Sequence, residues 1–117
     1  MRRSLFIALA QFVICATIAQ KRPLKDSLLS TVKQNQVPDT LRVRALNDLS
    51  KTYRLTFPDS TIYFSKQAYE LAVKISDVPG ISTSLNFIGI GCFYKGEYPE
   101  ALKYQKQALD FSELHHL

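Results

Sequence analysis

The chain has 117 residues, which leaves room for one small domain. Hydrophobic residues make up 46% of it and charged residues 21%, as in an ordinary folded protein. Its formal net charge of +5 falls to about +3 once Arg2 and Arg3 are set aside with the N-terminal segment, because 13 of the 15 basic residues then face 10 acidic ones. Such a charge favours solubility and argues against a nucleic-acid partner.

Residues 1–19 have the pattern of a signal peptide. Met1-Arg2-Arg3 is basic, residues 5–18 are mostly apolar, and Thr17 and Ala19 are small residues at the two positions that a signal peptidase reads. We therefore expect cleavage before Gln20 and export to the periplasm or another extracytoplasmic compartment. A retained membrane anchor is the first alternative, although the apolar run is shorter than the roughly 20 residues that span a bilayer. Lipidation of Cys15 is the second, although Ile14 is large for the residue before a lipidated cysteine.

A leader segment follows at residues 20–38. Leu24, Leu28 and Val32 recur at the i, i+4, i+8 spacing of one helical face, and the helix is expected to end between Asn35 and Pro38. The alternative is a leader that docks only loosely.

Residues 39–78 predict a pair of antiparallel helices. Asp39 or Thr40 is expected to cap the first helix, and Asp59 the second, because their side-chain oxygens can accept from unpaired N–H groups. A break between Leu55 and Pro58 separates the two helices. The residues predicted to face the core are Leu46, Leu49 and Tyr53 in the first helix, and Thr61, Phe64, Ala68, Leu71 and Ile75 in the second.

Residues 79–117 predict a second pair. Gly96 can adopt the left-handed conformation that ends a helix, and Pro99 suits the first turn of the next one. Gly89 is expected to face the partner helix and to allow a close approach. The predicted core residues are Leu85, Ile88 and Cys92, then Ala101, Tyr104, Ala108 and Phe111.

The two pairs are copies of each other. Leu46-Asn47 and Leu49-Ser50 recur as Leu85-Asn86 and Ile88-Gly89 after 39 residues, and Lys66-Gln67-Ala68 recurs as Lys106-Gln107-Ala108 after 40. An internal repeat of this period is typical of helical repeat proteins. The one-residue difference suggests an extra residue in the turn between Leu55 and Pro58. The predicted fold is all-α, with a leader helix and two helical hairpins at residues 39–78 and 79–117.

The second copy resembles a tetratricopeptide repeat. The residues that carry the resemblance are Leu85, Ile88-Gly89, Phe93, Gly96, Tyr98, Ala101 and Ala108-Leu109. Three features depart from that pattern: Cys92 stands where tyrosine is usual, Gln105 stands where a large aromatic residue is frequent, and no proline follows Phe111. The period is similar to that of longer-helix variants found in bacterial signalling proteins. The resemblance implies an α-solenoid that binds other proteins.

No group of residues indicates an enzyme, a metal site or a cofactor site. His115 and His116 are adjacent at the end of the chain, without an acidic residue or cysteine at a metal-ligand spacing. Cys92 is expected to be a buried small hydrophobic residue. Gly89-Ile90-Gly91 lies inside a predicted helix, where it cannot form a phosphate-binding loop. We therefore expect a non-enzymatic protein without a cofactor.

One helix face suggests a partner-binding surface. Arg44, Asn47, Lys51 and Arg54 recur beside the predicted core stripe of the first hairpin. Their equivalents in the second hairpin are Thr83, Asn86, Ile90 and Phe93. The resemblance implies that these faces form a concave groove for a peptide, and arginine and asparagine suit its carboxylates. The predicted partner-binding residues are Arg44, Asn47, Lys51, Arg54, Asn86, Ile90 and Phe93; the alternative is a solvated basic face.

Two functions are consistent with this pattern. The first is a protein-interaction module in the bacterial cell envelope. The second is the extracytoplasmic sensory segment of a histidine kinase or related regulator, tethered to the membrane by a segment further along a longer chain. In both cases Leu102, Leu109 and Leu114 lie on an uncovered face of the last helix. A two-hairpin array is short for a repeat protein, so we also expect the array to be incomplete and the chain to self-associate through this helix.

Overall fold

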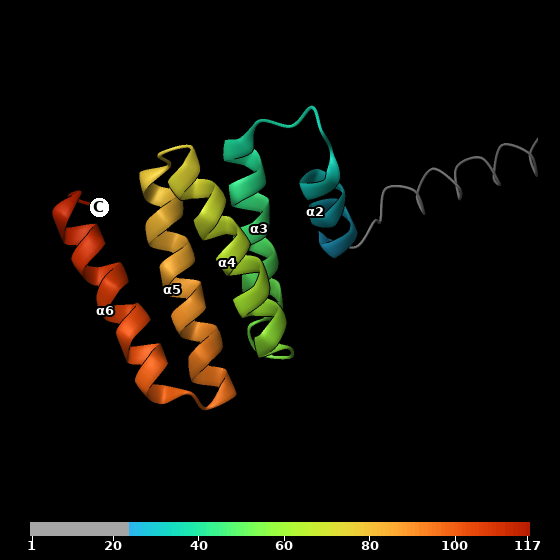
Figure 1. The fold of residues 1–117 in the computed structure, drawn as a ribbon. Coiled ribbons are helices and arrows are strands. Elements are labelled where there is room, and N and C mark those ends of the chain that lie inside the picture. The colour runs from blue at the N-terminus through green and yellow to red at the C-terminus, as the bar shows by residue number, and fades with distance from the viewer. Residues whose placement is uncertain (1–23) are drawn as a thin grey trace, which may run out of the picture.

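The computed structural model describes residues 24–117, and the predicted signal peptide lies outside this range. The described part is all-α, as predicted. Its helices lie side by side in chain order (Figure 1). They are α2 (Leu24–Lys33), α3 (Asp39–Tyr53), α4 (Pro58–Lys74), α5 (Val78–Lys95) and α6 (Tyr98–Leu114). None of them combines the length and apolar character that a membrane span requires.

The helices pack as two stacked hairpins. α3 packs against α4, and α5 packs against α6. α5 also packs against both helices of the first hairpin, whereas α2 packs against α3. This stacking has the character of a helical repeat, because each helix is covered chiefly by its neighbours along the chain.

Most of the predicted core residues are buried in both hairpins, whereas six of them are half-buried: Tyr53, Phe64, Leu71, Ile75, Tyr104 and Phe111. Leu46 and Leu49 of α3 are 3% and 0% exposed, and their equivalents Leu85 and Ile88 of α5 are 6% and 2% exposed. On the second helices, Ala68 and Ala108 are likewise buried. The sequence repeat is therefore matched by a repeat in burial.

The predicted place of the extra residue is wrong. α3 has 15 residues and α5 has 18, whereas the turn after α3 is longer than the turn after α5. The extra residue thus belongs to the second hairpin. Gly96 explains the short turn, because its left-handed conformation (φ 86°) ends α5 at once, with the N–H of Glu97 donating to the Cys92 carbonyl at 2.9 Å.

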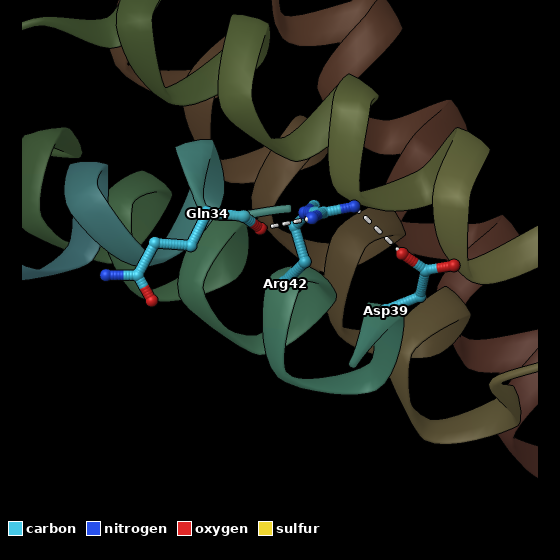
Figure 2. A network of polar contacts seen from close by, with 3 residues as sticks. All are labelled: Gln34, Asp39 and Arg42. Carbon is cyan, nitrogen blue, oxygen red and sulfur yellow. Dashed lines mark hydrogen bonds and ion pairs between the residues drawn. The ribbon is translucent and has the colours of Figure 1, made fainter. Parts of the chain in front are cut away.

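Arg42 fixes the link between α2 and α3 (Figure 2). Its guanidinium donates to the Gln34 carbonyl at 2.6 Å and to Asp39 Oδ1 at 2.9 Å. The N-cap of α3 is Pro38, and no side chain caps this helix. The predicted cap at Asp39 or Thr40 is therefore wrong, since the helix begins at Asp39 and this carboxylate pairs with Arg42 instead.

The α2 helix docks lightly. None of its residues is buried, and it ends at Lys33, slightly before the predicted boundary. Lys25 Nζ lies 4.7 Å from the centre of the Tyr53 ring, which also packs against the rings of Phe57 at 6.1 Å and of Phe64 in α4 at 5.8 Å. Tyr53 therefore joins α2 to the first hairpin.

Two further aspartates lie at helix starts, and one of them differs from the prediction. Asp59 does not cap α4, because Phe57 is the N-cap residue and Pro58 begins the helix. Its carboxylate instead lies 2.9 Å from Lys95 Nζ at the end of α5. Asp77 caps α5 by accepting from the Gly80 N–H at 3.1 Å.

Candidate partner-binding groove

An open apolar groove runs between α5 and α6. Its volume is about 640 Å³. One arginine and no acidic residue belong to its lining. The lining residues are Arg54, Gly89, Ile90, Phe93, Tyr94, Tyr98, Ala101, Leu102 and Gln105.

Aromatic residues form one end of the groove. The Phe93 ring centre lies 5.5 Å from that of Tyr94 and 5.5 Å from that of Tyr98, in edge-to-face arrangements. Phe93 is 55% exposed, Tyr98 61% and Leu102 72%. These side chains therefore leave apolar surface exposed in the groove, in addition to packing on one another.

Gly89 and Gln105 lie on opposite sides of the α5–α6 contact. Gln105 Nε2 donates to the Asn86 carbonyl of α5 at 3.0 Å. A Cβ atom on Gly89 would lie 2.6 Å from the same Nε2 atom. The predicted close approach at Gly89 is thus confirmed, and a flexible glutamine rather than an aromatic residue lies there.

Arg54 supplies the positive charge of the groove. It is half-buried at the end of α3, and none of the ion pairs within residues 24–117 involves it. An arginine at an apolar surface can hold a carboxylate in a bidentate geometry. The groove therefore combines apolar walls with one anion-binding group.

The structure divides the seven predicted partner-binding residues. Arg54, Ile90 and Phe93 line the groove together. Lys51 is exposed on α3. The remaining three line smaller hollows: Arg44 and Asn47 between α3 and α5, and Asn86 between α5 and α6.

Asn47 departs furthest from the prediction of an exposed stripe. It is only 5% exposed, because α5 packs over this side of α3. Its Oδ1 atom is buried and has no hydrogen-bond partner within residues 24–117. The basic stripe is therefore interrupted by an interior residue.

Six lining residues of the groove were not predicted as binding residues: Gly89, Tyr94, Tyr98, Ala101, Leu102 and Gln105. They come from two helices whose relative position sets the groove. Their exposure was foreseeable only for Leu102. The repeat relates two of them to the first hairpin, because Tyr98 and Leu102 correspond to Pro58 and Ile62.

Cys92 belongs to the interior and not to a reactive site. Its thiol is free and 4% exposed. Burial, followed by the nearby Glu97 carboxylate, raises the pKa of this thiol above its ordinary value of 9.0. A raised pKa disfavours the reactive thiolate at neutral pH. Within residues 24–117 no group of three potential ligands could hold a metal ion.

The raised pKa of Cys92 predicts a loss of stability in alkali. The folded state holds this proton more tightly than the unfolded state, so the stabilisation is present below the ordinary pKa and is lost as pH rises through the raised pKa. As pH rises above about 9, we expect the urea midpoint of the natural chain to fall more steeply than that of Cys92→Ala. Lys95, whose pKa is also raised by Asp59, titrates in both proteins and cancels in the comparison. Parallel pH profiles would contradict the prediction.

Comparison with protein-family models, with curated proteins and with solved structures finds no match to this chain.

Proposed function

We propose that this protein is an interaction module that binds a segment of a partner protein in the groove between α5 and α6. One observation carries the proposal: an open apolar groove of about 640 Å³ has exposed aromatic walls and an arginine without an ion-pair partner within residues 24–117. The sequence resemblance to tetratricopeptide repeats supports the same kind of function.

The repeat indicates that this surface is specialised. The positions of Lys51 and Arg54 in the first hairpin are occupied by Ile90 and Phe93 in the second. Charged side chains at these positions suit contact with water, whereas isoleucine and phenylalanine favour contact with a partner. Exposed aromatic residues grouped in a hollow are typical of the residues that dominate binding energy.

The chemistry of the groove selects a class of ligand. Burial of its apolar walls contributes about 25 cal/mol per Å² of surface removed from water. Arg54 adds directional recognition of a carboxylate. The preferred ligand is therefore a peptide that carries large apolar side chains with an aspartate, a glutamate or a C-terminal carboxylate beside them.

A matched pair of arginine variants tests this function. Peptides from a random display library, selected on the full chain and depleted on Leu102→Glu, supply the ligands. For peptides with an acidic residue we expect Arg54→Ser to lower affinity at least about tenfold, because a charge-assisted contact is worth about 1.5–3 kcal/mol. The variant should also flatten the salt dependence of binding, because exposed charges are screened by salt. Arg44→Ser removes the same charge outside the groove and should change affinity less than about twofold.

Two results would contradict the proposal. One is a selection that yields no peptide dependent on Leu102. The other is equal weakening by Arg54→Ser and Arg44→Ser, which would reduce the role of Arg54 to that of net charge.

A further inference from the structure

The groove is the second copy of a surface that is already occupied in the first hairpin. Tyr98 and Leu102 of α6 stand 40 residues after Pro58 and Ile62 of α4. In the first hairpin, α5 packs on α3 and α4, and Ile62 packs against a cluster of Ile88, Cys92 and Ala101. Leu102, the equivalent of Ile62, has no such cover and is 72% exposed.

A glycine makes the occupied contact possible. A Cβ atom on Gly91 of α5 would lie 2.6 Å from Ile62 Cγ1 and 3.2 Å from the Pro58 carbonyl oxygen. α5 therefore crosses the start of α4 with its backbone almost in contact. A helix that sits in the same way on α6 needs a glycine where it crosses Tyr98 and Leu102.

We propose that the groove accepts an amphipathic helix of a partner protein, seated as α5 is seated on the first hairpin. This inference rests on the proposed function and specifies its ligand. The helix carries a small residue at the crossing point and apolar residues on either side of it. Its groove-facing side is neutral or acidic, because the lining contains Arg54 and no carboxylate.

The sequence of α3 argues against a second copy of this chain as the occupant of the groove. The helix of this chain that corresponds to α5 is α3, and Thr52 of α3 stands at the position of Gly91. The branched threonine side chain, whose hydroxyl donates to the Asp48 carbonyl at 2.8 Å, would collide at the crossing point. A partner with a glycine there avoids the collision.

The test uses α5 itself, the helix that covers the equivalent surface of the first hairpin. A synthetic peptide with the sequence of residues 78–95, with serine in place of Cys92, is mixed with the full chain. Its two internal glycines leave the free peptide unfolded, so seating is detected as a gain of helical circular dichroism and by calorimetry. We expect the peptide change Gly91→Val to weaken binding by about 5-fold to 100-fold, since overpacking of this kind costs about 1–3 kcal/mol.

Two exposed leucines of α6 provide matched variants of the chain. Leu102→Glu places a charge in the groove and should abolish detectable binding. Leu114→Glu makes the same change at a residue that is 75% exposed and lies outside the groove lining, and should change affinity less than about twofold. Binding that survives Leu102→Glu would show that the peptide attaches elsewhere or displaces α5, and would overturn the inference.

The remaining outcomes separate this inference from the proposed function. If the helical peptide fails to bind while library peptides bind in a Leu102-dependent way, the groove takes extended ligands and the helix inference is wrong. If neither binds, both proposals fail. If sedimentation shows a dimer that Leu102→Glu dissolves, the occupant is a second copy and the partner helix is excluded.

Discussion

Replacement of Ile88 by alanine is expected to lower the free energy of unfolding by about 2–5 kcal/mol. Ile88 is 2% exposed and packs in one cluster with Cys92 and Ala101, against which Ile62 and Tyr104 also pack. The truncation therefore leaves a cavity where α4, α5 and α6 meet. Because a domain has only about 5–15 kcal/mol of net stability, the loss is a large fraction of the total.

Urea unfolding of the full chain, followed by circular dichroism, measures this loss. Leu102→Ala is the matched control, since Leu102 is 72% exposed and its truncation should change stability by less than about 0.5 kcal/mol. Similar losses in the two variants would mean that the second hairpin is not packed as the structure shows.

Gly91→Ala is expected to destabilise the protein by about 1–3 kcal/mol, although alanine is intrinsically the better helix former by about 1 kcal/mol. The new methyl group meets Ile62 and the backbone oxygen of Pro58, and backbone atoms cannot move aside cheaply. The result is measured as a shift of the urea midpoint at constant slope.

Gly89→Ala is the matched control for this prediction. It gains the same helix propensity, but its methyl group meets only the side chain of Gln105, which can rotate away. We expect this variant to be neutral or up to about 1 kcal/mol more stable. The prediction fails if the two alanine variants have the same stability.

The core could be predicted from the sequence because burial follows local periodicity. Leu46, Leu85 and Ile88 each lie on the apolar stripe of their own helix, and the stripe faces the neighbouring helix. The roles of Gly96 and Pro99 could also be predicted from the sequence, since a left-handed helix end and a first-turn proline depend on the residue itself.

The predictions that failed had both local and distant causes. Asp59 follows a proline that begins the helix, so this carboxylate is free to pair with Lys95, which lies 36 residues away. Asn47 lies beside the core stripe of α3, and only the packing of α5 on α3 buries it. A single helix cannot show how many neighbours will cover it.

Some residues of the groove could be predicted from the sequence, and others could not. Ile90 and Phe93 were predicted from the repeat, because each position has an equivalent in the first hairpin. Tyr94 and Leu102 required the placement of α6 against α5. Periodicity identifies the residues that share a face of one helix, but a hollow between two helices depends on their separation and angle.

The glycines of α5 have a consequence for cooperativity. Gly89 and Gly91 each weaken an isolated helix by about 1 kcal/mol relative to alanine, so α5 gains its order from α3, α4 and α6. In a nearest-neighbour description of a repeat array, the intrinsic term of this helix is unfavourable and its interface terms are favourable. Unfolding of the first hairpin would therefore remove contacts that α5 needs to stay helical, so the second hairpin should unfold together with the first. Tyrosine fluorescence, which comes from three tyrosines in each hairpin, and helical circular dichroism from the whole chain should therefore report a single transition with one midpoint.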